Sequence, residues 1–184
     1  MPPKVKFSKE EIIHTAVELT REQGFEAVTA RDLGARLGTS SKPVYTAFSS
    51  MQELKQAVIA QAYARYQQLE QETVSEGKYP PYKSMGMAYI RFAKEEPNLF
   101  RLLFMRDRTG EASIDYGYQD AVQMVQAQTG LDHDRANLFH AEIWIAVHGI
   151  AVMFATAYLD WDMELVSRML TDFYQGLKSR QIAE

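Results

Sequence analysis

Two short helical segments joined by a tight turn, at residues 29–38 and 40–48, constrain this chain more than any other feature. Gly38 ends the first segment and opens a Gly-Thr-Ser turn, and Ser40 is expected to cap the second segment. A third helical pattern begins directly after the second segment. Val44 and Phe48 are four residues apart, which places both on one helix face that can pack into a small core. Two short helices in this arrangement are typical of a helix-turn-helix, whose second helix enters the DNA major groove.

Helical periodicity extends over almost the whole chain, and no segment shows the alternation of a β-strand. Capping residues and helix breakers mark the helix ends, as in the capping boxes expected from Ser8 with Glu11 and from Ser50 with Glu53. We therefore predict an all-α fold of about nine helices, with a three-helix helix-turn-helix domain at residues 1–55 and a helical ligand-binding and dimerisation domain at residues 56–184. The expected helices span residues 8–24, 29–38, 40–48, 50–76, 81–96, 97–105, 115–129, 132–159 and 162–179.

The composition excludes several classes of site. The chain has 184 residues and no cysteine, so disulfides and cysteine-ligated zinc or iron–sulfur sites are ruled out. The N-terminus has no apolar run of the kind found in a signal peptide. The longest apolar stretch, residues 143–159, is interrupted by His148 and Gly149, and a buried helix explains it better than a membrane span of about 20 residues. We expect a cytoplasmic protein without a membrane partner.

Charge is distributed unevenly along the chain. Residues 1–55 hold eight Lys or Arg and seven Asp or Glu, a net charge of +1, whereas residues 56–184 hold twelve and seventeen, a net charge of −5. The sign of this difference agrees with nucleic-acid binding by the N-terminal part, although the difference is small. Any basic patch must therefore be produced by the geometry of the fold.

The outward side of the segment at residues 40–48 carries groups suited to DNA contacts. Small hydroxyl groups and a cation can reach base edges and phosphates without steric hindrance. The alternative interpretation is that this segment belongs to a small helical cap whose polar surface does not contact DNA. The side chains expected on this outward face are Ser41, Lys42, Tyr45, Thr46 and Ser49.

Further phosphate contacts are expected around this face. A helix begins at Thr29 and Ala30, and its unpaired backbone N–H groups form a natural phosphate-binding site. Lys4 and Lys6 form a basic N-terminal arm, and Lys55 lies one turn into the following helix. We therefore expect double-stranded DNA as a partner.

Residues 8–55 resemble the DNA-binding domain of the tetracycline-repressor (TetR) family of bacterial regulators. The resemblance implies that Thr29 and Tyr45 contact phosphates and that Ser41, Lys42, Pro43 and Thr46 face bases, with Ser40 at the same turn. Met51 departs from the pattern, because the family often has Lys there, and Ala47 stands where His or Tyr is common. The matching residues are Glu22-Gln23-Gly24-Phe25, Val28-Thr29, Leu33-Gly34, Leu37-Gly38, Ser40, Val44-Tyr45, Phe48 and Glu53-Leu54.

The C-terminal part resembles one subgroup of TetR effector domains, through residues 89–104 and the Trp-x-x-x-His-Gly pattern at residues 144–149. Aromatic residues between the fourth and eighth helices could line a pocket for an apolar or aromatic effector, or could simply form the core. The candidates are aromatic residues, three of which carry a polar tip on an otherwise apolar ring. They are Tyr89, Phe92, Phe104, Trp144 and His148.

The last two helices, at residues 132–159 and 162–179, carry more apolar surface than one small domain can bury. Pairing these two helices with their symmetry mates in a four-helix bundle would form a homodimer. The alternative is that both helices pack only against the core of their own chain. Ile150, Phe154, Met169 and Phe173 are the expected interface residues.

These patterns favour a ligand-responsive transcriptional regulator, most simply a repressor released from a palindromic operator by its effector. An activator, or a regulator that needs no ligand, would share the same DNA-binding domain. The rival from another class is an all-helical ligand carrier or enzyme that does not act on DNA. No nucleophile elbow, phosphate loop or dinucleotide turn occurs, so we expect no catalytic residues, metal or cofactor.

Overall fold

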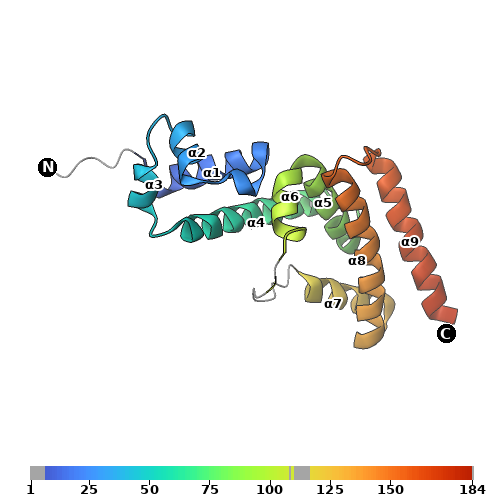
Figure 1. Ribbon diagram of the computed structural model, residues 1–184. Coiled ribbons are helices and arrows are strands. Elements are labelled where there is room, and N and C mark those ends of the chain that lie inside the picture. Colours follow the sequence, from blue (N-terminus) through green and yellow to red (C-terminus); the bar gives the residue numbers. More distant parts are fainter. Residues whose placement is uncertain (1–6, 108, 110–116, 184) are drawn as a thin grey trace. The chain divides into compact units, whose positions relative to one another are not determined.

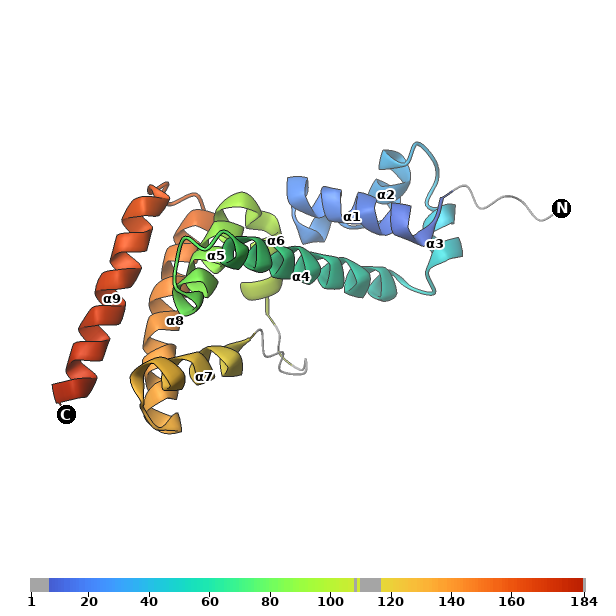
Figure 2. The same cartoon turned by 180° about the vertical axis from the view of Figure 1, so that it is seen from behind.

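The computed structural model describes residues 7–107, 109 and 117–183, and this part of the chain contains nine α-helices, one 3₁₀ turn and no strand (Figures 1 and 2). The all-α prediction is confirmed. The helices are α1 (Lys9–Gln23), α2 (Ala30–Arg36), α3 (Lys42–Ala47), α4 (Met51–Ser75), α5 (Pro81–Glu95), α6 (Pro97–Phe104), α7 (Tyr118–Thr129), α8 (His133–Ala155) and α9 (Met163–Ala183), with the 3₁₀ turn at Phe25–Ala27.

The described residues form two compact units. The first unit comprises the described residues within the ranges 1–68 and 96–106, and it therefore holds α1 to α3, most of α4, and α6. The second unit comprises the described residues within the ranges 69–95 and 107–184, and it therefore holds the end of α4 together with α5, α7, α8 and α9. The domain boundary expected after residue 55 falls inside α4, which continues without a break to Ser75.

Two caps fix the helix starts of the first unit. The expected capping box of α1 is confirmed, because the Ser8 N–H donates to the Glu11 carboxylate at 2.7 Å and the Glu11 N–H donates to Ser8 Oγ at 3.1 Å. At the start of α4, Ser50 Oγ accepts the Glu53 N–H at 3.1 Å. The Glu53 carboxylate, however, accepts from the N–H and the hydroxyl of Ser49, at 2.8 and 2.7 Å, so the second half of this box is shifted by one residue.

The core of the first unit joins the three N-terminal helices to α4. Val44 and Phe48 are 1% and 4% exposed, which confirms that this side of the second short segment faces inward. Ile12, Leu33 and Leu54 are fully buried with them. Because these apolar side chains come from four helices, α3 is held by the core on one side only.

Helix α6 belongs to the first unit through polar contacts with α1. Both guanidinium nitrogens Nε and Nη2 of Arg21 donate to the Glu96 carboxylate, at 2.9 and 2.8 Å. The Asn98 side chain donates to the Arg21 carbonyl oxygen at 2.8 Å. Glu96 precedes Pro97, so this bidentate pair fixes the point where α6 begins.

Helices α5 and α8 form the centre of the second unit and run parallel. The Tyr82 hydroxyl lies 2.9 Å from His140 Nδ1, and about two turns further along both helices the Tyr89 hydroxyl lies 2.8 Å from His148 Nδ1. Helix α8 is the one described helix that is long and apolar enough to cross a membrane by length and composition. The core helix of a globular protein meets the same criterion, and nine residues of α8 are buried.

Candidate nucleic-acid interface

Helix α3 presents a polar face opposite its buried side. Tyr45 is 60% exposed although it directly follows Val44, which is 1% exposed. Lys42 and Thr46 are also exposed, and Thr46 Oγ1 donates to the Lys42 carbonyl oxygen at 2.9 Å, which leaves the lone pairs of the hydroxyl oxygen outward. Within the described residues, neither the Tyr45 hydroxyl nor the Lys42 ammonium has a partner. This face is therefore able to receive external hydrogen-bonding groups.

The turn before α3 differs from the expected one. Ser41, and not Ser40, is the N-cap residue, and its side chain makes no capping hydrogen bond. Ser40 Oγ accepts the Lys42 N–H at 3.4 Å, a long bond, because the helix starts one residue later than the Ser40 cap would require. Pro43 is partly buried in the first turn, where its missing N–H is not needed.

The start of α2 lies beside a carboxylate. Thr29 is the exposed N-cap residue; its Oγ1 accepts the Asp32 N–H at 3.2 Å and donates to the Asp32 carboxylate at 2.5 Å. Ala30 is 7% exposed, so its side chain belongs to the core and only its backbone could meet a phosphate. The Thr29 hydroxyl must release Asp32 before it can donate to a phosphate oxygen.

Arg31 is a candidate that the sequence reasoning missed. Its side chain is exposed in the first turn of α2 and has no partner within the part of the chain that the structure describes. A cation in the first turn is unfavourable next to the positive end of the helix dipole, and this signal in the sequence could have identified it. Arg36, by contrast, is engaged by the Glu22 carboxylate.

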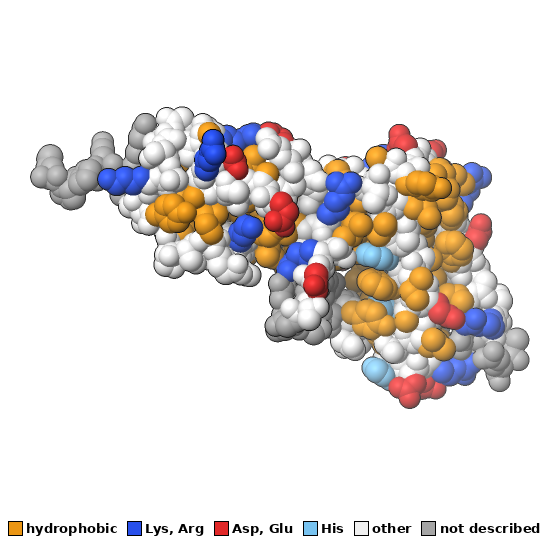
Figure 3. Space-filling model, in the orientation of Figure 1, with side chains coloured by type: hydrophobic (Ala, Val, Ile, Leu, Met, Phe, Trp, Pro, Cys, Tyr) orange, Lys and Arg blue, Asp and Glu red, His pale blue; other side chains and the backbone are white. Residues whose placement is uncertain are grey.

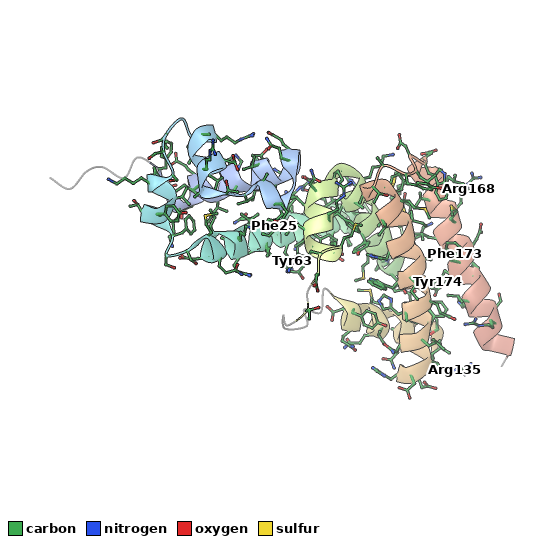
Figure 4. All side chains as sticks on the ribbon, in the orientation of Figure 1. Phe25, Tyr63, Arg135, Arg168, Phe173 and Tyr174 are labelled. Atoms are coloured by element: carbon green, nitrogen blue, oxygen red, sulfur yellow. The ribbon has the colours of Figure 1, made fainter. Side chains whose placement is uncertain are left out.

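The remaining expected cations differ in their positions. The Lys55 ammonium lies 5.0 Å from the centroid of the Phe25 ring, which Figure 4 labels. This cation–π contact ties Lys55 to the first unit, so it is half-buried and not freely extended. Lys4 and Lys6 lie outside the described residues.

The second unit brings together three of the five expected pocket residues. The Tyr89 hydroxyl bonds His148, and Trp144 stacks on the His148 ring with centroids 5.0 Å apart and an interplanar angle of 12°. Burial lowers the pKa of His148 below its ordinary value. Phe92 is fully buried, and Phe104 lies in the first unit, edge-on to Tyr66 at 5.4 Å.

Hydrophobic side chains gather over α8 and α9 on the face shown in Figure 3. Of the expected interface residues, Ile150 and Phe154 are 6% and 8% exposed and so lie in the core of the chain itself. Met169 is half-buried and Phe173 is 41% exposed. The apolar surface on α8 is instead formed by other residues, which are Leu138, Trp144, Ile145 and Met153.

Two family comparisons cover most of the chain. Residues 12–58 match the family described as "Bacterial regulatory proteins, tetR family". Residues 82–173, half of the chain, match "Tetracyclin repressor-like, C-terminal domain". An uncharacterized HTH-type transcriptional regulator of Mycobacterium tuberculosis is 25% identical over 161 residues, which cover 84% of this chain and 73% of that protein.

The fold and the exposed α3 face define a DNA-binding transcriptional regulator with a helix-turn-helix. Specifically, the chain belongs to the TetR family, with the family's N-terminal DNA-binding domain followed by its C-terminal helical domain.

Proposed function

We propose that this chain is a homodimeric repressor that holds a palindromic operator through α3 and releases it when a small apolar or aromatic effector binds. The exposed polar face of α3 carries the proposal, because Tyr45 and Lys42 are kept in solvent while Val44 anchors the helix from behind. A helix supported in this way can enter the major groove without rearranging its own core.

The proposed contacts divide into two kinds. Ser41, Lys42 and Thr46 face base edges, because their short or flexible polar groups occupy the outward face of α3. Tyr45 and Arg31 contact phosphates, since an exposed phenol and an unpaired guanidinium can both donate to phosphate oxygens. Sequence specificity then comes from the base contacts, and the salt-sensitive part of the affinity comes from the phosphate contacts.

The α8–α9 surface supports the proposed homodimer. Ile145 and Phe173 are 66% and 41% exposed, and large apolar groups in contiguous patches mark association surfaces. Gly149 in α8 and Gly176 in α9 would meet no atom of the chain if given a Cβ, so neither is required by packing within one chain. Glycine inside a helix costs about 1 kcal/mol relative to alanine, and close approach of a second copy offers a reason for it.

The effector response is proposed for the second unit. A ligand that binds one arrangement of the dimer better than the DNA-bound arrangement would lower the affinity for the operator by that difference. The rival function, a helical carrier or enzyme that does not act on DNA, is disfavoured by the two family matches.

The first experiment selects bound fragments from a random-sequence DNA pool and measures binding to the selected duplex. We expect Tyr45→Ala and Lys42→Ala each to weaken binding by about 1–3 kcal/mol, which is the range for one lost specific or charge-assisted contact. Tyr158→Ala is the matched control, because Tyr158 is an exposed tyrosine of the second unit. Unchanged operator affinity in both α3 variants would contradict the assignment of this face.

A salt series separates DNA binding from the rival function. The logarithm of the affinity should fall linearly with the logarithm of the salt concentration, because phosphate contacts release counterions. Arg31→Ala should make this slope shallower by about one if Arg31 contacts one phosphate. Absence of DNA binding even at low salt would favour the rival.

A further inference from the structure

A hollow of about 230 Å³ lies within the second unit, and none of the aromatic residues expected from the sequence lines it. It opens between α5, the end of α7, α8 and α9. Its walls are mostly apolar, and Gly86 of α5 faces α8 and α9, since a Cβ there would lie 3.3 Å from the Val147 side chain and 3.5 Å from the Leu170 side chain. Because no side chain projects from position 86, the space beside it stays open.

Two aromatic rings border the hollow and are held in place. The rings of Tyr82 and Tyr174 have centroids 6.1 Å apart, and the Tyr174 ring also lies edge-on to Phe139 at 5.3 Å. Figure 4 labels Tyr174 beside its neighbour Phe173 on α9. The Tyr82 hydroxyl is bonded to His140 and the Tyr174 hydroxyl donates to Gln128 at 3.3 Å. Since both hydroxyls have partners, these residues offer mainly their rings to a ligand.

Lys83 places a cation at the edge of this apolar space. Its ammonium donates to Thr171 Oγ1 at 2.7 Å and lies 5.1 Å from the centroid of the Tyr79 ring. An ammonium has three donors, and within the described residues none of those of Lys83 is bonded to a carboxylate. Partial burial and the nearby positive charge of Lys78 lower the pKa of Lys83, and the Glu164 carboxylate offsets part of this effect.

The surrounding charges leave the site positive. Glu164 is the carboxylate that acts on Lys83, but it lies 3.6 Å from the ammonium of Lys78. Two lysines therefore share one carboxylate, which leaves one positive charge in excess. An anionic group entering beside Lys83 would replace a neutral hydroxyl partner with a charged one, which makes the hydrogen bond about twice as strong.

We infer that this hollow binds a small carboxylate with a single aromatic ring, whose ring packs against the rings of Tyr82 and Tyr174 along the apolar wall and whose carboxylate bonds Lys83. The size fits, because a cavity of about 150 Å³ accommodates one benzene ring and the remainder has room for a carboxyl group and a short linker. The inference names the effector class for the proposed regulator and rests on the proposed function for that role; the binding itself does not depend on DNA.

The test uses the full chain and three probes, namely benzoate, phenylacetate and 3-phenylpropanoate, each compared with its neutral amide by calorimetry. We expect at least one acid to bind and its amide to bind about tenfold or more weakly, since a hydrogen bond to a charged group is worth more than a neutral one. Lys83→Met should remove this preference, whereas Lys83→Arg should keep most of it. Lys94→Met, which removes another cation of α5 that does not line the hollow and is paired with Asp160, should leave the preference in place.

A blocking variant locates the binding. Thr171→Trp fills the hollow from an exposed position and should abolish binding, while Asp172→Trp, at the next exposed position of α9 and outside the lining, should not. Circular dichroism and thermal unfolding verify that each variant is folded. No binding by any acid, equal binding of acid and amide, or binding that survives Thr171→Trp would each overturn the inference.

Operator binding is measured separately, so that the two proposals can fail separately. If the acid binds and operator affinity falls in wild type but not in Thr171→Trp, the site and the effector role are both supported. Acid binding without any change in operator affinity would support the site and contradict the proposed effector response. Operator binding by a chain that binds none of the acids would overturn this inference and leave the DNA-binding proposal standing.

Discussion

At the residue scale, position 34 has room for a hydrogen atom and nothing larger. A Cβ at Gly34 would lie 2.7 Å from the carbonyl carbon of Ser40, 2.8 Å from its oxygen and 2.9 Å from the Ser41 nitrogen. These are backbone atoms, which cannot rotate away as a side chain can. The absent side chain on α2 therefore allows the turn before α3 to fold back directly onto α2, and this contact positions the candidate DNA-contacting face.

Gly34→Ala should destabilise the protein although alanine is the better helix former. The gain in helix propensity is about 1 kcal/mol, and overpacking against a fixed backbone typically costs about 1–3 kcal/mol, so we expect a net loss together with weaker operator binding. Denaturant unfolding and operator affinity provide the measurements. Ala35→Ser, which adds one atom at the adjacent exposed position of α2, is the control and should change stability by at most about 0.5 kcal/mol. Equal stability of Gly34→Ala and wild type would show that the turn can move.

At the element scale, the start of α4 is joined to α1 and to the end of α3 by one carboxylate. Glu53 accepts the Lys9 ammonium at 2.8 Å and both donors of Ser49. The Lys9 ammonium also lies 4.9 Å from the centroid of the Phe48 ring. These contacts lie at the surface, yet they link three helices at the point where α3 ends and α4 begins.

The contacts of Glu53 predict a dependence of stability on pH. Hydrogen bonds from Lys9 and Ser49 lower the pKa of Glu53 from 4.5 to about 2. Because the folded-state pKa is depressed, the stabilising contribution is fully present above about pH 4.5 and is lost as the pH falls through the range from 4.5 to 2. An NMR titration of the Glu53 carboxyl carbon should show the low pKa, and Lys9→Gln should raise it.

Glu53→Gln should lower the unfolding midpoint at pH 7 and have a smaller effect at pH 3, because at pH 3 the unfolded wild type already binds a proton at Glu53 and the folded protein gains less from keeping this carboxylate ionised. Glu26→Gln is the control, because the exposed Glu26 carboxylate has no partner within the described residues. The same loss of stability at both pH values would contradict this account.

At the scale of the whole molecule, the apolar surface on α8 and α9 has no covering element within the second unit. Ile145 is 66% exposed and Phe173 is 41% exposed, while the neighbouring Ile143 and Leu170 are almost buried. Two helices that are buried on one side and apolar on the other are suited to a four-helix bundle with a second copy. A two-fold dimer would also match an operator with two half-sites.

Ile145→Glu and Phe173→Glu should shift the protein from dimer to monomer in sedimentation experiments, because a charge placed in an apolar interface must be desolvated without a partner. Val74→Glu is the matched control, since Val74 is 45% exposed and lies on α4. Operator affinity should fall with the loss of the dimer, as one half-site contact no longer supports the other. Dimers of unchanged strength in both variants would exclude this surface as the interface.

The sequence by itself determined the helical fold and the two-sided character of α3, because both follow from local periodicity and capping. The spacing of Val44 and Phe48 identifies the buried face whatever the rest of the chain does, and Ser8 with Glu11 fixes the start of α1. The same local rules placed the α3 cap one residue early at Ser40, because the approach of Ser40 to Gly34 is a contact between segments.

Only the tertiary structure decided which apolar residues of α8 are core and which are surface. Ile150 is buried and Ile145 is exposed although both are isoleucines on one apolar helix, and only the packing of α5, α7 and α9 around α8 distinguishes them. The hollow beside Lys83 likewise depends on residues from four helices, so no local pattern in the sequence could indicate it. Side-chain spacing along the chain governs the helical fold and the buried face of α3. Contacts between distant segments govern which residues of α8 are buried and where the hollow forms.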